Sequence, residues 1–443
     1  MKTAILFTAL SAASVIAAKQ SVIALNDHER NILKQELDAW KTEFGQEAEA
    51  RGLTPPTSNT ESLTDTETDE LQRFLDSKLG AELASLENPS AQFTHKNVFA
   101  LLKSDEFARY VQVSFGNDTY AQAESVPERA EAVPAQVDWS SHKCNPPVPN
   151  QGQCGSCWAF STLGATEFAH CLATDELLDL SEQQIVSCST TSYGCQGGFP
   201  PKALDWIRGG VCTKQDWPYT AGVDGQTGSC NRSCQKQPLA IGQTLTTSGD
   251  AGLVAALASQ PVTVVVEAGN DVWKYYQGGV ITQCPGSHSD HAVVAIGYTS
   301  DSFKIKNSWG PNWGENGYIR LQRTTGANGM GMCNVVEAGS YSQLAVAPKP
   351  VPSSTPALTK PPTQAPVTKT PWTQAPLPTK ASTLPPTQAP LPPTQAPGPA
   401  PGNAVNTYGQ CGGKDYTGSK NCKPTDECHY FDEWYSQCLP KQA

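Results

Sequence analysis

Two stretches near the N-terminus carry apolar side chains at helical spacing. The first follows Asp27, a residue type that caps helix N-termini, and its apolar positions are Leu33, Leu37, Trp40 and Phe44. The second repeats the spacing with Leu71, Phe74, Leu75 and Leu79. The polar stretch from Pro55 to Glu70 lies between them and predicts a loop. The pattern therefore predicts a helical region over residues 19–132, which contain no cysteine.

The middle of the chain mixes helical and strand patterns. Residues 158–172 are apolar nearly all round, which predicts a buried helix. Short runs rich in β-branched and aromatic residues predict four strands, at Val262–Val266, Ala292–Tyr298, Phe303–Asn307 and Tyr318–Gln322. We therefore expect residues 133–346 to form a globular α+β domain.

The N-terminus has the layout of a secretory signal peptide. Lys2 precedes an apolar run from Ala4 to Leu10, and small residues follow as far as Ala18. This predicts a signal peptide at 1–18 and a secreted, extracellular protein. A membrane anchor is the alternative, but the run is short, and no other segment approaches the roughly 20 apolar residues of a membrane helix.

The C-terminal part has two sections of different composition. Residues 347–404 are rich in proline, lack acidic residues and repeat Thr-Gln-Ala-Pro at positions 363, 373, 387 and 394, which predicts an extended linker. Residues 405–443 form a unit too short to be stable through apolar burial alone. We expect disulfides to hold it together.

Composition narrows the function classes. The chain has 443 residues, too many for one core, and its net charge of −11 argues against a nucleic-acid partner. Its fifteen cysteines indicate an oxidising compartment. Eleven lie between Cys144 and Cys333, here called the middle group, and four lie between Cys411 and Cys438. Since eleven is an odd number, one cysteine of the middle group stays a free thiol if the others form disulfides with one another. Catalysis is one reason for keeping a thiol.

Cys157 is the candidate for that thiol. It follows a Gly-Ser turn and precedes the predicted buried helix, and a helix N-terminus lowers the pKa of a thiol. With Cys154 it also forms a Cys-x-x-Cys pair, typical of redox pairs or half a metal site. If Cys157 is instead a nucleophile, it needs a base and a third group that orients this base, and we then expect neither a metal nor a cofactor.

The segment around Cys157 resembles the papain family of cysteine proteases. Cys-Gly-Ser-Cys-Trp at 154–158 is that family's signature, and His291 and Asn307 follow Cys157 by 134 and 150 residues. The resemblance extends from about residue 133 to 341. It implies a two-lobed α+β fold, with a helical lobe and a β-barrel-like lobe, and hydrolysis of peptide bonds through an acyl-enzyme thioester.

The resemblance also implies a role for each matching residue. Cys157 is the expected nucleophile, with His291 as its base and then the acid for the leaving amine. Asn307 is expected to orient the imidazole, and Trp309 to shield that hydrogen bond. Gln151 is expected to donate to the oxyanion hole. The residues expected to bind substrate are Gly197, Gly198, Phe199, Pro200, Val265, Ala292, Ala338 and Trp309. Among them, the apolar Phe199, Pro200, Val265, Ala292 and Ala338 predict a bulky apolar substrate residue two positions before the scissile bond.

Three disulfides of the middle group are implied by the same resemblance. They are Cys154–Cys195, Cys284–Cys333, and Cys188 paired with either Cys230 or Cys234. Cys144, Cys171, Cys212 and the remaining member of the Cys230/Cys234 pair would form two further bridges, whose pairing stays open.

Residues 97–102, followed by Asp105, Glu106 and Phe107, resemble part of papain-type inhibitory propeptides. We therefore expect residues 19–132 to inhibit the enzyme until they are removed between about residues 125 and 133. A helical domain with its own function is the alternative. The sequon at Asn117 would be lost on maturation, and the sequon at Asn231 would remain as a glycosylation candidate.

The last unit resembles fungal-type cellulose-binding modules in its opening Tyr-Gly-Gln-Cys-Gly-Gly, its Trp-Tyr-Ser-Gln-Cys-Leu close and its cysteine spacing. The resemblance implies the disulfides Cys411–Cys428 and Cys422–Cys438. It also implies a carbohydrate-binding face made of Tyr408, Trp434, Tyr435 and Gln437. A disulfide-stapled unit with another partner is the alternative.

Together these features predict a secreted, monomeric cysteine endopeptidase made as a zymogen. Its expected partners are protein or peptide substrates, its own propeptide, and cellulose or a related wall polysaccharide. Neither nucleic acid nor membrane is expected as a partner. The alternative is a wall-binding adhesive or recognition protein whose protease domain is inactive.

Overall fold

The computed structural model describes residues 21–55, 63–112, 133–231, 233–324, 326, 329–345, 410–412, 414, 419–424, 426–430 and 436–441. Two compact units divide the chain at residues 357 and 358. The predicted signal peptide, the sequon at Asn117, the expected maturation region and the linker all lie outside the described residues. No described helix is both long and apolar enough to cross a membrane.

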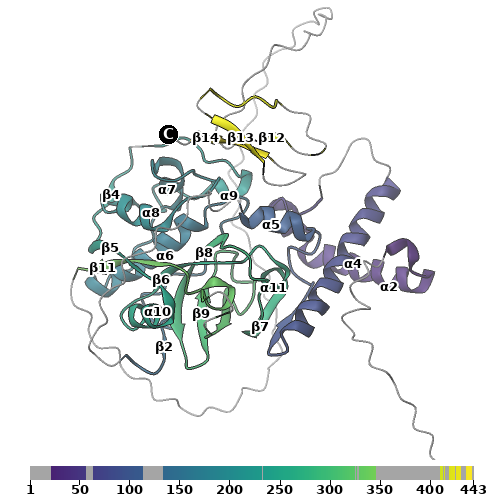
Figure 1. Ribbon diagram of the computed structural model, residues 1–443, viewed down its shortest axis with the longest axis horizontal. Coiled ribbons are helices and arrows are strands. Elements are labelled where there is room, and N and C mark those ends of the chain that lie inside the picture. The colour runs from purple at the N-terminus through teal and green to yellow at the C-terminus, as the bar shows by residue number, and fades with distance from the viewer. Residues whose placement is uncertain are drawn as a thin grey trace, which may run out of the picture. The chain divides into compact units, whose positions relative to one another are not determined.

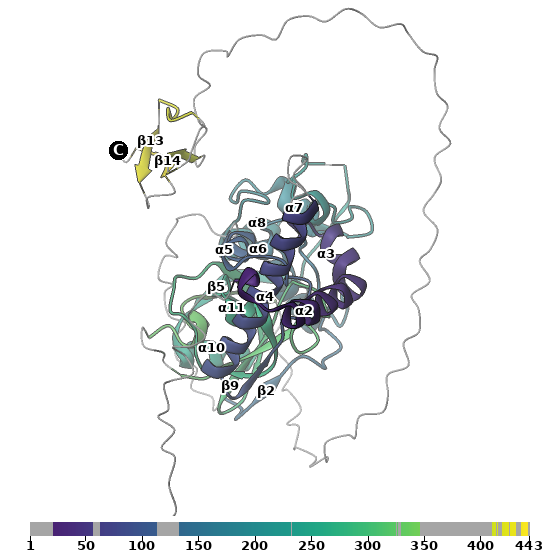
Figure 2. The same ribbon diagram turned by 90° about the vertical axis from the view of Figure 1, so that its right-hand side faces the viewer.

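The N-terminal region is helical, as its apolar spacing predicts. It contains the short turn η1 (Val22–Ala24), α2 (Asp27–Trp40), η2 (Lys41–Gly45), α3 (Gln46–Ala50), α4 (Leu63–Glu87), the strand β1 (Ala91–Phe93) and α5 (Ser104–Gln112). Helix α2 packs against α4 beside the rest of the larger unit (Figures 1 and 2), with the rings of Trp40 and Phe74 6.4 Å apart.

Two local predictions in this region are wrong. The N-cap of α2 is Asn26 and not Asp27, because Asn26 accepts a hydrogen bond from the Glu29 amide while the Glu29 carboxylate accepts one from the Asn26 amide. The predicted loop over residues 55–70 is also too long, since α4 already begins at Leu63. The apolar residues of α4 pack against the rest of the larger unit, and the helix also includes the polar residues that precede them.

The helical side of residues 133–346 is built around one buried helix. Helix α6 (Cys157–Thr174) includes the predicted buried helix, and α7 (Glu182–Cys188), α8 (Pro200–Ile207) and α9 (Ala221–Asp224) lie on the same side. A short ladder joins β3 (Val211–Cys212) to β4 (Lys236–Gln237). In Figure 1 these helices lie above the main sheet, with α6 between.

The other side of the domain is a sheet that has nine strands among the described residues. Its order is β1-β7-β10-β9-β8-β6-β11-β5, and β2 pairs with β8. The strands are β2 (Val137–Asp138), β5 (Ile241–Thr247), β6 (Val262–Val266), β7 (Tyr276–Ile281), β8 (His291–Tyr298), β9 (Ser302–Lys306), β10 (Tyr318–Gln322) and β11 (Gly339–Leu344). Helices α10 (Gly249–Leu257) and α11 (Asp271–Tyr275) and the turn η3 (Met332–Asn334) complete this side.

Five disulfides stabilise this domain. The structure pairs Cys154 with Cys195, Cys188 with Cys230, and Cys284 with Cys333. The two pairings that the sequence leaves open are Cys144–Cys171 and Cys212–Cys234. Cys157 is the one cysteine of the fifteen that joins no disulfide.

The second unit contains a small antiparallel sheet. Its strands are β12 (Gln410–Gly412), β13 (Asp426–Tyr430) and β14 (Ser436–Pro440), in the order β12-β14-β13. The disulfides Cys411–Cys428 and Cys422–Cys438 cross-link it. Both have the connectivity that the resemblance implies.

Candidate active site

Cys157 is the first residue of α6. Its N-cap Ser156 has a non-helical backbone, and its side chain makes no capping hydrogen bond, so the first amides of α6 are not satisfied from that side chain. The preceding loop is held by the Cys154–Cys195 disulfide and by a hydrogen bond from the Gly155 amide to the Cys195 carbonyl at 3.0 Å. The Ala292 amide donates to Sγ of Cys157 at 3.3 Å, which places the thiol against the start of β8.

His291 begins β8 and contacts two residues that follow β9. Its Nε2 donates to Oδ1 of Asn307 at 2.8 Å, and its ring stacks on Trp309 with centroids 5.0 Å apart. Nδ1 is buried and has no hydrogen-bond partner in the described part of the chain. Burial lowers the pKa of the imidazole to about 4, against the opposing effect of the hydrogen bond to Asn307.

Gln151 connects the two sides of the domain. Its Nε2 donates to the Cys154 carbonyl at 3.1 Å, while its Oε1 accepts a hydrogen bond from Oγ of Ser308 at 2.6 Å. Its backbone amide donates to the Ser308 carbonyl at 2.8 Å. The side-chain amide is therefore fixed in the loop that leads to Cys157.

The expected substrate-binding residues come from both sides. Val265 and Ala292 are paired in the β6–β8 register, and the Val265 amide donates to the Ala338 carbonyl at 3.2 Å. Phe199 and Pro200 begin α8. Gly198 has no room for a side chain, because a Cβ there would lie 2.5 Å from the Trp158 ring.

The N-terminal region covers this site. The rings of Phe99 and Phe107 meet Trp309 edge-on at 5.7 and 5.5 Å, and the Tyr110 hydroxyl donates to the Gly152 carbonyl at 2.6 Å. Cys157 and His291 are both 0% exposed in this structure. Tyr110 was missed in the sequence, although its position three residues after Phe107 puts both on one helix face.

Further contacts attach the N-terminal region to β7 and α11. Strand β1 pairs with β7, where Gly279 has a φ of +88° and a Cβ would lie 2.3 Å from the Ser90 carbonyl oxygen. Oδ1 of Asn88 accepts from the amides of Thr282 and Gln283 at 2.9 and 2.8 Å. Buried Lys274 donates to the Leu102 carbonyl at 2.5 Å. Such contacts between distant segments left no signal in the sequence.

The expected carbohydrate-binding face is only partly described. Tyr408, Trp434 and Tyr435 lie outside the described residues. Gln437 lies in β14, where the register pairs it with Gln410 of β12 and His429 of β13. Asn231, the remaining sequon, is exposed in the larger unit.

Comparison with known proteins gives two family matches. Residues 133–343 match the papain family cysteine protease, and residues 407–435 match the fungal cellulose binding domain. Germination-specific cysteine protease 1 of Arabidopsis thaliana is 35% identical over 268 residues, which cover 59% of this chain and 70% of that protein. Chymopapain of Carica papaya is 38% identical over 255 residues, covering 55% of this chain and 72% of that protein.

Solved structures extend the likeness to the N-terminal region. The proform of Amb a 11, a ragweed pollen cysteine protease allergen, is 26% identical with a TM-score of 0.60 and covers 72% of this chain and 96% of its own. Recombinant stem bromelain precursor is 28% identical with a TM-score of 0.59, covering 70% and 99%. Both of these structures are proenzymes. The chain belongs to the papain family of cysteine proteases, with a fungal cellulose-binding domain near its C-terminal end.

Proposed function

We propose that this chain is the zymogen of an exported cysteine endopeptidase that its C-terminal unit holds on cellulose. The observation that carries the catalytic part is the position of Cys157, at the N-terminus of α6 and against β8, beside a histidine whose Nε2 is held by Asn307. Residues 1–18 support export, because their pattern is that of a signal peptide.

The mechanism follows from these positions. The Cys157 thiol gives its proton to Nδ1 of His291, the ring nitrogen that Asn307 leaves available, and the resulting thiolate attacks the substrate carbonyl. The Gln151 side-chain amide and the Cys157 backbone amide stabilise the oxyanion. His291 then protonates the leaving amine, which leaves a thioester. Water activated by His291 hydrolyses the thioester and regenerates the thiol.

The substrate pocket favours bulky apolar side chains two residues before the scissile bond. Val265, Ala292 and Ala338 come together through the β6–β8 register and the hydrogen bond between β6 and Ala338. Glu337, next to Ala338, is engaged by a hydrogen bond from the Ser289 hydroxyl. A peptide library should therefore show an apolar preference at this position, and a dominant preference for arginine would contradict it.

The N-terminal region inhibits the enzyme by covering the site. The Tyr110 contact with Gly152 and the packing of Phe99 and Phe107 on Trp309 support this role, because a substrate needs the space they occupy. Removal of residues up to about 132 is expected to expose Cys157.

The catalytic proposal is tested by labelling with a thiol-directed epoxide. The mature wild type should be labelled at Cys157, and the intact zymogen should be labelled far more slowly. Cys157→Ser should abolish labelling, whereas His291→Ala should keep the thiol but slow its reaction. A mature wild type that stays unlabelled would instead support the inactive, wall-binding alternative.

The targeting proposal needs a separate binding experiment. The full chain should be retained on crystalline cellulose, because aromatic rings such as Trp434 and Tyr435 stack on the C–H faces of sugar rings. Trp434→Ala should release it, while Tyr193→Ala, at an exposed ring of the larger unit, serves as the matched control. Equal retention of the wild type and Trp434→Ala would contradict the proposal that the aromatic face binds cellulose.

A further inference from the structure

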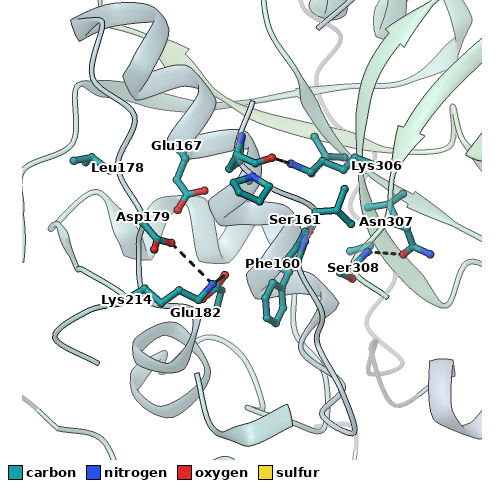
Figure 3. Close-up of a pocket in the computed structure, with 18 of the residues that line it drawn as sticks. Phe160, Ser161, Glu167, Leu178, Asp179, Glu182, Lys214, Lys306, Asn307 and Ser308 are labelled. Carbon is teal, nitrogen blue, oxygen red and sulfur yellow. Dashed lines mark hydrogen bonds and ion pairs between the residues drawn. The ribbon is translucent and has the colours of Figure 1, made fainter. Parts of the chain in front are cut away.

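A cavity lies between α6 and β8. Ala292 and Asn307 belong to its lining, whereas Cys157 and His291 do not. It has a volume of about 440 Å³. Figure 3 shows that its charged side chains come from both sides of the domain, Glu167 and Glu182 from the helical side and Lys306 from β9. Leu177, which also lines it, is 39% exposed, so the cavity is open to solvent there.

Lys306 brings a positive charge into one part of this cavity, and Glu167 lines the same cavity. It is 5% exposed, and its Nζ donates to Oδ1 of Asn145 at 3.0 Å and to the Pro146 carbonyl. An ammonium group has three donors, and both of these acceptors are uncharged. No carboxylate of the described residues forms an ion pair with it. Burial lowers the pKa of Lys306 to about 8, although Glu167 is near enough to act in the opposite direction and raise it, so the side chain still carries its charge at neutral and acidic pH.

Glu182 gives another part of the cavity an unused acceptor. It is 6% exposed, and Lys214 donates to its Oε1 at 2.8 Å. Its Oε2 is buried and has no hydrogen-bond partner among the described residues. A buried acceptor without a donor is costly, which favours a ligand or water that donates to it.

Apolar side chains form most of the remaining wall. They are Pro146, Pro147, Val148, Pro149, Phe160, Leu177, Leu178 and Val294. A ligand that fits therefore has an apolar body, an anionic group for Lys306 and a donor for Glu182. An apolar anion leaves Glu182 Oε2 unsatisfied, and an apolar cation leaves Lys306 without a counter-ion.

We propose that this cavity binds an apolar amino acid or dipeptide as a zwitterion, with its carboxylate on Lys306 and its ammonium on Glu182. Such molecules are the class of end product that complete proteolysis releases. The binding itself does not depend on the proposed catalytic mechanism, so the two proposals can fail separately.

Occupancy of the cavity is expected to affect the active site through shared walls. Ala292, Asn307 and Ser308 line the cavity, and Ala292 directly follows His291. Asn307 accepts a hydrogen bond from the His291 imidazole, and Ser308 donates one to the Gln151 side chain. A ligand that contacts α6 on one side and β8 on the other stabilises their packing. We therefore expect it to raise the melting temperature of the protein.

The experiment uses the intact zymogen carrying Cys157→Ser, because the N-terminal region then covers the substrate cleft. L-leucine and L-leucyl-L-leucine are titrated by calorimetry, with leucinamide and 4-methylpentanoate as the cation-only and anion-only analogues. The zwitterions should bind at least about tenfold more tightly than either analogue, since each analogue loses one charge-assisted contact.

Two substitutions test the location. Gly164→Leu should abolish binding, because Gly164 lines the cavity and a Cβ there meets only Val294, at 3.4 Å, so the longer side chain fills the space. Glu182→Gln should weaken binding about tenfold, while Glu49→Gln, at an exposed acid of α3, should have no effect. Circular dichroism verifies that each variant folds. No heat of binding, equal binding of the analogues, or unchanged binding to folded Gly164→Leu would each overturn the proposal.

Discussion

Oδ1 of Asn307 accepts a hydrogen bond from Nε2 of His291 at 2.8 Å, and this contact determines which ring nitrogen faces the chemistry. With Nε2 engaged, Nδ1 is the nitrogen that can exchange a proton with the thiol. Trp309 stacks on the same ring, where we expect it to keep water from the hydrogen bond. In the proposed mechanism, residues after β9 therefore orient the base, and the start of α6 positions the nucleophile.

Asn307→Ala should lower kcat/KM of the mature enzyme by about 10²-fold, in the range that loss of a positioned acid–base group costs. The imidazole loses the contact that selects its tautomer and orientation. Steady-state kinetics across pH 4–8 measure the effect. The thermal unfolding of the variant is the control, and an unchanged kcat/KM in a folded variant would contradict the role of Asn307.

Gln151→Glu should lower kcat by about 10²–10³-fold with a small change in KM, because oxyanion donors act mainly in the transition state. The substitution keeps an oxygen that accepts from Ser308 but removes the Nε2 donor. Ser308→Ala is the matched comparison, since it removes the supporting bond and keeps the donor. If kcat falls equally in both variants, Gln151 acts only through the loop.

Glu106→Gln should let the zymogen process itself at a higher pH than the wild type. Burial raises the pKa of Glu106, but hydrogen bonds from the Arg73 guanidinium and the Lys103 amide outweigh it and hold this pKa below 4.5. Its stabilising contribution is complete above about pH 4.5 and is lost as the pH falls through the lowered value.

Processing can be followed by gel electrophoresis from pH 3 to 7. Asp105→Asn is the matched control, because exposed Asp105 pairs only with Arg109 on the same helix among the described residues. An identical pH of onset for Glu106→Gln and the wild type would show that the Arg73–Glu106 contact does not hold the N-terminal region in place.

Glu167→Gln should flatten the pH dependence of stability between about pH 4.5 and 8. Burial, and then the nearby Glu182, raise the pKa of Glu167 from 4.5 to about 8, so the folded protein favours the protonated form. The unfolded chain binds fewer protons in this window, and the free energy of unfolding of the wild type therefore falls as the pH rises. Urea denaturation at pH 5 and pH 8 measures the slope, and equal slopes for both proteins would contradict the prediction.

The sequence predicts four strands of the larger unit, and two of them, Val262–Val266 and Tyr318–Gln322, have the same bounds in the structure. The first is a buried run of β-branched residues and the second alternates buried with half-buried positions, so both have a clear strand pattern. Other strands, such as β5, β7 and β11, were not predicted. The prediction fails at residues 63–70, where the polar side chains Glu67 and Glu70 pair with Lys34 of α2 and Lys41 of η2. A local pattern cannot anticipate a helix whose polar turns face another helix.

Some features of the candidate site could likewise be predicted from the sequence, and others could not. Cys157, His291 and Asn307 could be named because their motif has fixed spacing. The Cys144–Cys171 pairing could not, since it depends on how the loop before Gln151 lies along α6. No sequence pattern brings Glu167, Glu182 and Lys306 together, and only the fold shows that they are buried in one cavity.

The burial of Cys157 also bears on how the chain is oxidised. Fourteen other thiols must find their partners, and Cys154, three residues away, is one of them. A reactive thiolate in solvent would attack the new disulfides and exchange with them. In the folded structure Cys157 is 0% exposed, so its thiol cannot reach a disulfide of another molecule. The same burial that withholds the thiol from substrates therefore also withholds it from thiol–disulfide exchange.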